Sequence, residues 1–290
     1  MTAIQLAPEH KTGLTLSNPV MPAAGCFGLG LEYDRLVEVE ALGAVVVGPI
    51  TAAPRQGAAP PRVLAVPGGV LLHTGLANPG IAAVMRRYSR TWVRCTVPVI
   101  AHVAGTSPDE AVSCCQRLSG IEAIAGIELG LPDIPISLNP IGPKSGLSDF
   151  LDDVVTIIQA ARVAASQPLI VRLPMAYADA LCEAAVESGA NALTIIAPPR
   201  GTAWHKPSEQ FITGGLHGPL VLPLALRALR RVAERVPVPL IGCGGIHSAE
   251  DGRAFLRAGA VAIQIGGAIW HDPACLARIA HRLSPQVSPD

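Results

Sequence analysis

The sequence predicts an α/β protein with the (β/α)8 TIM-barrel fold and a short N-terminal β-hairpin. Eight short, apolar, β-branched segments recur along the chain, and most are separated by segments in which apolar residues return every three or four positions. Strands without polar–apolar alternation are typical of a parallel sheet that helices cover on both faces. Because 290 residues suit one barrel of about 250 residues, we expect a closed barrel. An open doubly wound sheet is the alternative.

Each expected strand is a short apolar run. In chain order the strands are 20–24 (VMPAA), 43–47 (GAVVV), 97–103 (VPVIAHV), 124–129 (IAGIEL), 168–174 (PLIVRLP), 191–196 (NALTII), 238–242 (VPLIG) and 261–266 (VAIQIG). The helical segments between them include SPDEAVSCCQRLSG, LDDVVTIIQAARVAAS, ADALCEAAVESGA, LPLALRALRRVAERV and SAEDGRAFLRAGA. Residues 4–16 (IQLAPEHKTGLTL) predict two short strands around a glycine-containing turn, a hairpin that could close the barrel floor.

The chain is expected to form one domain over residues 1–290, because no linker, repeat or low-complexity segment divides it. The hairpin is expected within residues 1–18 and the barrel within 19–283. The proline-rich segment 197–210 (APPRGTAWHKPSEQ) has two interpretations. It is either a mobile cover that carries Trp204, His205 and Lys206, or an ordinary surface loop.

Composition argues against several classes of partner. Only 15% of the residues are charged, and 22 Lys and Arg balance 22 Asp and Glu, so no general field favours nucleic acid or an anionic membrane. The N-terminal MTAIQLAPEHKTG lacks the basic start and apolar core of a signal peptide. No apolar run reaches the roughly 18 residues that suggest a membrane span. The sequence therefore predicts a cytoplasmic protein whose ligand is a small molecule.

Neither the cysteines nor the histidines form a metal-binding motif. The seven cysteines (26, 95, 114, 115, 182, 243 and 275) include no CxxC pair, so most are expected to be buried thiols. His73, His102, His205 and His217 lie on or near expected strand-end loops, but no pair has HxxxH or HExxH spacing. One of them could act as acid, base or ligand in a new site. Packed loop histidines are the alternative.

Glycine pairs follow the last two expected strands. The segment GCGGIHSAED places Gly244 and Gly245 after strand seven, with Ser248 as the expected cap of the next helix, and IQIGGA places Gly266 and Gly267 after strand eight. Glycines there let backbone N–H groups approach an anion, and barrel enzymes often bind phosphate at these loops. The pairs predict a phosphate site, with tight turns that hold no ligand as the alternative.

Several motifs occur in an informative order. They are LSNPVMPAAGCFG, GAVVVGPIT, TGLANPG, IEL, VRLP, GGLHGPLVLPLALR, GCGGIHSAEDGRAFLRAGA and IQIGGA. In this order they resemble the dihydroorotate dehydrogenase family, most closely its soluble branch that uses flavin mononucleotide (FMN). The resemblance covers nearly the whole chain and implies a flavoprotein oxidoreductase of pyrimidine biosynthesis. It also implies a homodimer or a complex with a related or electron-transfer subunit.

The resemblance assigns cofactor-binding residues and also shows departures. It implies that Gly244, Gly245, Gly266 and Gly267 hold the FMN phosphate, that Gly215 and Gly218 support the preceding loop, that Ala24 and Gly25 lie along the flavin, and that Arg172 replaces a Lys facing the flavin edge. The alternative for Arg172 is an ion pair with Glu128 at the next strand end. Polar residues of the family are replaced at the other positions: its first Lys by Gly48, its orotate-binding Asn by Leu72, the Asn after strand four by Gly130, its base by Leu131, a later Asn by Asp133, and an Asn-Ser or Asn-Thr pair by Ala197-Pro198.

These replacements leave the catalytic residues unidentified. Oxidation of dihydroorotate requires a base and polar groups that hold a carboxylate and a cyclic diamide, and loss of one general base typically costs about 10² to 10⁴ in rate. Ordinary dihydroorotate oxidation is therefore not expected. Two hypotheses remain: an FMN-dependent oxidoreductase with an altered, more apolar substrate, and a catalytically silent paralogue that acts as a partner subunit or binds a phosphate-bearing ligand.

Overall fold

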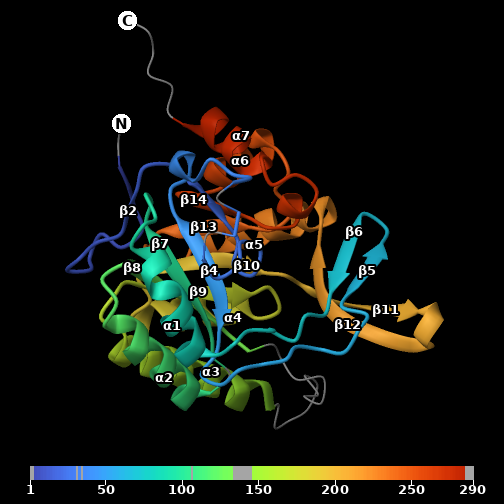
Figure 1. The fold of residues 1–290 in the computed structure, drawn as a ribbon, viewed down its shortest axis with the longest axis horizontal. Helices are drawn as coiled ribbons and strands as arrows, with labels where there is room; N and C mark the ends of the chain where they lie inside the picture. Colours follow the sequence, from blue (N-terminus) through green and yellow to red (C-terminus); the bar gives the residue numbers. More distant parts are fainter. Residues whose placement is uncertain (1–2, 31, 34, 106, 133–145, 285–290) are drawn as a thin grey trace, which may run out of the picture.

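The predicted barrel is present in the structure. The computed structural model describes residues 3–30, 32–33, 35–105, 107–132 and 146–284, of which 146 and 147 are described by their backbone alone. Its eight-stranded sheet has the order β3 (Val20–Pro22), β14 (Ala262–Ile265), β13 (Leu240–Cys243), β10 (Ala192–Ala197), β9 (Leu169–Pro174), β8 (Ile124–Gly130), β7 (Val99–Ala104) and β4 (Val45–Ile50) (Figure 1). Every pairing within it is parallel. All eight expected strands therefore form, and they form one sheet.

The sheet curves until its first and last strands lie side by side. The Gly43 N–H donates to the Val20 carbonyl at 2.9 Å, which links β3 to the entry of β4. A Cβ at Gly43 would lie 1.8 Å from the Asn18 carbonyl oxygen, so only glycine permits this close approach. The result is a nearly closed barrel, as the count of β/α units predicts.

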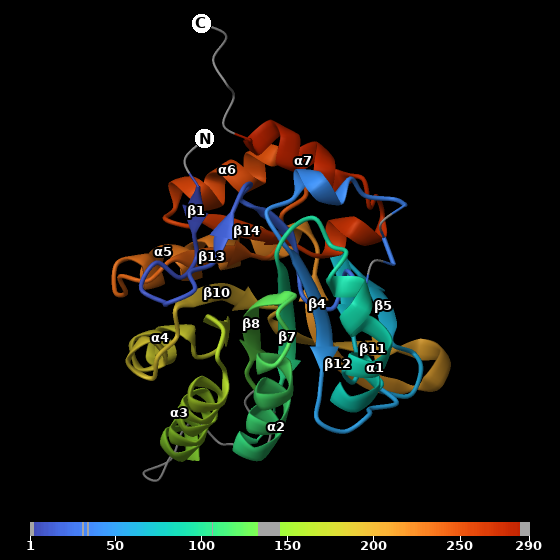
Figure 2. The same ribbon diagram turned by 60° about the vertical axis from the view of Figure 1, so that its left-hand side comes forward.

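Helices cover the outside of the barrel (Figure 2). They are α1 (Ile81–Trp92), α2 (Pro108–Ser119), α3 (Gly146–Ala164), α4 (Ala178–Glu187), α5 (Leu222–Ala233), α6 (Ala249–Arg257) and α7 (Cys275–Leu283), with short 3₁₀ turns η1 (Val39–Ala41), η2 (Lys206–Ser208), η3 (Pro219–Val221) and η4 (Gly267–Trp270). The larger apolar core lies between these helices and the strands. No helix in the described part of the chain is long and apolar enough to cross a membrane.

The N-terminal hairpin closes one end of the barrel. Strands β1 (Ile4–Gln5) and β2 (Thr15–Leu16) pair antiparallel, which confirms the predicted hairpin. A second apolar cluster joins Leu6, Leu14 and Leu16 to inward-facing strand residues such as Ile100 and Ile170. Because the hairpin fills this end, a ligand site is left to the opposite end, where the strands finish.

A second sheet borders that opposite end and was not expected from the sequence. It has the order β11 (Arg200–His205), β12 (Gln210–His217), β6 (Gly69–Leu72) and β5 (Val63–Val66), and Figure 1 shows its β11–β12 hairpin projecting from one side of the barrel. Segment 197–210 is therefore largely strand, where the sequence suggested a cover or a loop. The reason is that β11 alternates exposed and half-buried residues and owes its structure to backbone pairing with β12.

Two local predictions are also confirmed. Ser248 caps α6 in a capping box, because its side chain accepts from the Asp251 N–H while the Asp251 carboxylate accepts from the Ser248 N–H. All seven cysteines are free, and all except the half-buried Cys95 are buried. The cap matters for the site because it fixes the loop that runs from β13 into α6.

Candidate functional site

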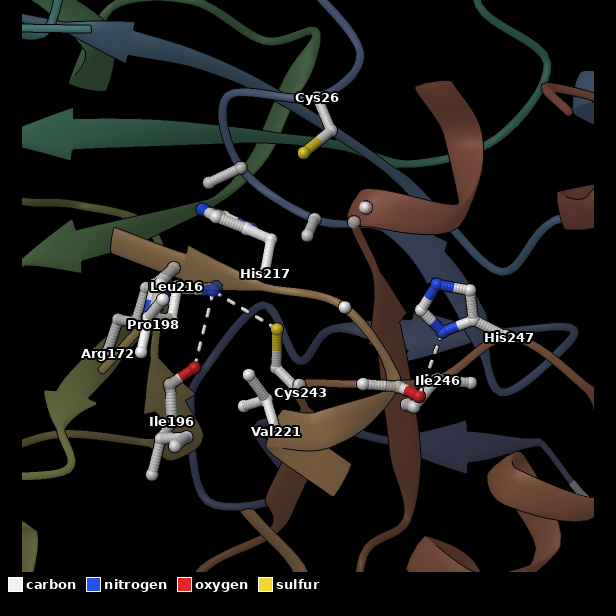
Figure 3. Close-up of a pocket in the computed structure, with 17 residues that line it drawn as sticks. Cys26, Arg172, Ile196, Pro198, Leu216, His217, Val221, Cys243, Ile246 and His247 are labelled. Carbon is white, nitrogen blue, oxygen red and sulfur yellow. Dashed lines mark hydrogen bonds between the residues drawn. The ribbon is translucent and has the colours of Figure 1, made fainter. Parts of the chain in front are cut away.

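Two adjoining cavities open at the carboxyl ends of the barrel strands. The smaller, which we call the cradle cavity, has a volume of about 40 Å³ and lies against the loops after β13 and β14 (Figure 3). The larger, which we call the main cavity, has a volume of about 640 Å³ and extends toward the ends of β4, β7, β8 and the small sheet. Ala24, Cys26, Arg172, Pro198 and His217 line both. The cavities therefore form one connected site.

The cradle cavity is built from glycine backbone. Gly244 (φ +122°) and Gly245 (φ +75°) follow β13, and Gly266 and Gly267 follow β14. A Cβ at Gly245 would lie 2.3 Å from the Leu222 backbone nitrogen at the start of α5. The loop after β13 therefore requires glycine both for its conformation and for its packing. A cavity walled by such backbone, and larger than the ~10–15 Å³ that one water needs, suits the phosphate end of a ligand.

A buried polar cluster lies beneath the main cavity, centred on Glu128. Its carboxylate accepts hydrogen bonds from Thr194 Oγ1 at 2.8 Å and Gln264 Nε2 at 2.6 Å, and lies 2.9 Å from His102 Nδ1 and 3.5 Å from Arg172 Nη1. Burial raises the pKa of the fully buried Glu128 carboxyl, but the Arg172 charge and the hydrogen bonds from His102 and Thr194 outweigh it, and that pKa lies at about 2. Glu128 is therefore an anion at neutral pH.

Arg172 is held rigidly at the junction of the two cavities. Its guanidinium donates to Gln264 Oε1 at 2.5 Å, to Cys243 Sγ at 3.1 Å and to the Ile196 carbonyl at 3.4 Å, the last two of which are drawn in Figure 3. Burial raises the pKa of the Cys243 thiol, so that sulfur is neutral and Glu128 supplies the balancing charge. Arg172 thus pairs with Glu128 and also lines both cavities.

His102 occupies the space that side chains at two neighbouring strand ends would need. A Cβ at Gly130 would lie 2.8 Å from His102 Cε1 and 2.9 Å from its Nε2, and a Cβ at Gly48 (φ +141°) would lie 2.7 Å from the His102 carbonyl oxygen. Because the Glu128 carboxylate can only accept, the His102 Nδ1 must donate to it. In the neutral imidazole this leaves Nε2 as the hydrogen-bond acceptor. The His102 ring lines the main cavity.

The other histidine candidates differ in position. His73 and His217 line the main cavity, whereas His205 lines neither cavity and its Nδ1 lies 2.6 Å from Ser208 Oγ. The His217 ring packs edge-on against Trp270 with the ring centroids 5.1 Å apart. Burial, and then the Arg172 charge, lower the pKa of His217 to about 4. His217 is therefore neutral at pH 7.

The described lining of the main cavity carries basic side chains and no carboxylate. It includes Arg62, Arg172 and Arg200 together with His73, His102 and His217, and no Asp or Glu. Leu72, Leu76 and Leu131 supply its apolar surface. A partly apolar, anionic ligand suits such a lining.

Every cofactor position suggested by the sequence lies at this site. Gly218, Gly244, Gly245, Gly266 and Gly267 line the cradle cavity, Gly25 and Gly215 line the main cavity, and Ala24 and Arg172 line both. Gly130, Leu131 and Ala197 also line the main cavity, while Asp133 lies outside the described residues. Gln264 and Thr194 were not among the candidate residues predicted from the sequence, although a polar residue inside an otherwise apolar strand is the signal that identifies both.

A barrel with a glycine cradle after its last two strands, and a basic cavity beside it, is typical of barrel enzymes that bind a phosphate-bearing ligand. The family model described as "Dihydroorotate dehydrogenase" matches residues 8–287. The chain belongs to the dihydroorotate dehydrogenase family. This membership supports FMN as the cofactor, and the cradle glycines, Ala24, Gly25 and Arg172 all line the two cavities.

Several curated relatives bear the name "Dihydroorotate dehydrogenase B (NAD(+)), catalytic subunit". One from Pelobacter propionicus is 37% identical over 279 residues, which are 93% of this chain and 90% of that protein. One from Trichlorobacter lovleyi is 36% identical over 92% of this chain and 88% of its own length. One from Desulforudis audaxviator is 35% identical over 99% of this chain and 92% of its own. The similarity therefore extends over the whole barrel.

Proposed function

We propose that this protein is an FMN-dependent oxidoreductase whose substrate is more apolar than dihydroorotate. The observation that carries the proposal is the contrast within one connected site: the cradle and Arg172 suit FMN, while Leu72, Leu131 and Ala197 line the main cavity where the family resemblance implies polar contacts. A substrate with a cyclic diamide would leave its polar groups unpaired there, at about 1–3 kcal/mol each. A substrate with a carboxylate and an apolar body suits the lining better.

The residues that would hold FMN follow from the cavity linings. Gly244, Gly245, Gly266 and Gly267 would surround the phosphate, and Arg172 would lie at the polar edge of the ring. Bound FMN would supply the hydride acceptor for the oxidation. A permanent positive charge at Arg172 would favour the reduced flavin, which carries negative charge.

His102 is the residue that we place as the proton acceptor. When a carbon–hydrogen bond is oxidised, the hydride carries away two electrons, and a proton from the neighbouring atom must pass to a base. The His102 ring lines the main cavity, and the Glu128 carboxylate beside its Nδ1 would leave Nε2 to take the proton and would stabilise the imidazolium that forms. This His102–Glu128 pair would replace the base that the sequence lacks at Leu131.

A catalytically silent paralogue is the second candidate, and the glycines at positions 48 and 130 favour it because they supply no reactive side chain. The relatives' names include the words "catalytic subunit" and "NAD(+)". An active chain would therefore be expected to work in a complex with an electron-transfer subunit that uses NAD(+). A silent chain would bind FMN or another phosphate-bearing ligand without turnover.

The absorption spectrum of the purified protein, before and after FMN is added, separates the candidates. We expect flavin bands, slow bleaching by dihydroorotate in anaerobic mixing, and faster bleaching by dihydro acids that keep the carbonyl next to the carbon that loses the proton and carry methylenes in place of the ring N–H groups. With the fastest reductant, His102→Asn should slow bleaching about 10²- to 10⁴-fold and leave the FMN Kd within about twofold; His205→Asn is the matched control. Absence of flavin bands in both samples would overturn the oxidoreductase proposal. Fast bleaching by dihydroorotate would overturn the altered substrate.

A further inference from the structure

His217 stands at the junction of the two cavities. It is among the residues that line both, and it ends β12 opposite Val70 of β6. A Cβ at Gly267 would lie 3.5 Å from the His217 Cβ, and a Cβ at Gly215 would lie 3.3 Å from its Nε2. The side chain therefore extends from the cradle toward the main cavity. Figure 3 shows the ring between Cys26 and Arg172, pointing across the cavity.

The imidazole of His217 is available to a ligand. The other long polar side chain at the junction, Arg172, is tied to Gln264, Cys243 and Ile196. His217 has only an edge-on ring contact with Trp270, and no hydrogen bond from its ring to any described residue is present. A polar ring that is mostly covered, faces a cavity and lacks a protein partner is suited to bond a ligand.

We propose that His217 is a ligand-binding residue that becomes positively charged and donates a hydrogen bond to the phosphate of the bound flavin nucleotide. A ligand with its phosphate in the cradle and its ring in the main cavity must pass His217, because the residue lines both. The proposal rests on FMN binding as proposed above and adds a residue that the glycine motifs do not identify. A charged hydrogen bond of this kind is worth more than a neutral one.

The electrostatic surroundings of His217 explain why its imidazole would become protonated only when the ligand binds. The titratable groups that line the two cavities around His217 are Arg172, Cys26, Cys243 and His247 on the cradle side and Arg62, His73, His102 and Arg200 on the main side. None of these groups is a carboxylate, and Glu128 lies beneath Arg172. Without ligand, burial and Arg172 keep the pKa of His217 at about 4. A phosphate that carries nearly two negative charges would raise it, so binding would take up a proton.

The sign of the pH dependence follows from this linkage. The complex with FMN holds one more proton, on His217, than the free protein does. The contribution of His217 to FMN affinity therefore increases as the pH falls from the raised pKa of His217 in the complex toward its pKa of about 4 in the free protein. Riboflavin lacks the phosphate and should not show this gain. The titration of the phosphate of free FMN, near pH 6, is common to every variant and cancels in the ratio of their Kd values.

The test measures FMN and riboflavin Kd by flavin fluorescence between pH 5.5 and 8 for the unmodified protein, His217→Gln, His217→Asn and the control His205→Gln. We expect His217→Gln to weaken FMN about tenfold at pH 6 and progressively less toward pH 8, with riboflavin changed by less than about twofold. Calorimetry in buffers of different ionisation enthalpy should show greater proton uptake by the unmodified protein than by His217→Gln. Both His217 variants should keep the circular dichroism of the folded barrel.

The alternative outcomes separate the two proposals. If FMN binds and its Kd has the same pH profile in the unmodified protein and both His217 variants, the role of His217 is wrong and the proposed function stands. Equal losses of affinity for FMN and riboflavin would also overturn the proposed role of His217, since they would show that His217 contacts a part of the flavin other than the phosphate. If the unmodified protein binds neither flavin, the FMN site is wrong and the His217 proposal is overturned with it.

Discussion

Two parts of the site contain glycines, but for different reasons. One is the glycine cradle after β13 and β14; the other is the opposite wall of the main cavity, at the ends of β4, β7 and β8. Gly245 is required by the backbone of α5, whose Leu222 nitrogen would lie 2.3 Å from an added Cβ. Gly130 is required by one side chain, because the ring of His102 fills the space beside it. Backbone constraints leave a pattern in the sequence, whereas a single neighbouring side chain does not.

The largest expected effect on ligand affinity comes from a substitution in the glycine cradle. Gly245→Val should reduce FMN affinity at least about 100-fold and lower the free energy of unfolding by about 2–4 kcal/mol, because it combines a positive φ with a backbone clash. Fluorescence titration and urea unfolding measure the two effects. Gly120→Val is the control, since Gly120 has no atom within 4 Å of its added Cβ. Normal FMN binding by Gly245→Val would show that the phosphate lies elsewhere.

The second prediction concerns the stability contributed by Glu128, at the centre of the buried polar cluster beneath the main cavity. The pKa of Glu128 is lowered from 4.5 to about 2, so Glu128 contributes stability that is present above pH 4.5 and is lost as the pH falls toward 2. A shift of this size corresponds to roughly 3 kcal/mol. Glu128→Gln should therefore be less stable than the unmodified protein at pH 7 by about 3–5 kcal/mol, because Arg172 and His102 lose their anion.

Urea unfolding between pH 3 and 7 checks this prediction. The difference in unfolding free energy between the two proteins should shrink as the pH falls below 4.5, since protonation removes the same charge from the unmodified protein. Glu183→Gln provides a matched control, because Glu183 forms an ion pair with Arg235 at the surface. A difference that stays constant over this pH range would show that Glu128 is not charged in the fold.

The same contrast explains how far the sequence could predict the structure. The eight strands and Ser248 were predictable because periodicity and capping depend on neighbours in the chain. The β11–β12 hairpin was not, because β11 has no apolar run and depends on pairing. The glycine cradle could be identified from two adjacent motifs. The His102–Glu128 pair could not, since its members come from different strands and only the register of β7 and β8 places them opposite each other.

The smallest expected effect tests why position 130, at the end of β8 in the opposite wall of the main cavity, is a glycine. Gly130→Asn should lower the free energy of unfolding by about 1–3 kcal/mol, because its Cβ would lie 2.8 Å from the His102 ring. In a His102→Ala background the same substitution should cost less than about 1 kcal/mol, so the two changes are coupled. Urea unfolding of the two single variants and the double variant measures this coupling, with Gly120→Asn as a control in both backgrounds. Equal costs in the two backgrounds would mean that the backbone, as in the cradle, is what requires glycine at position 130. A large coupling would mean that His102 and Gly130 form one unit, in which the imidazole has taken the place of a polar side chain at the end of β8.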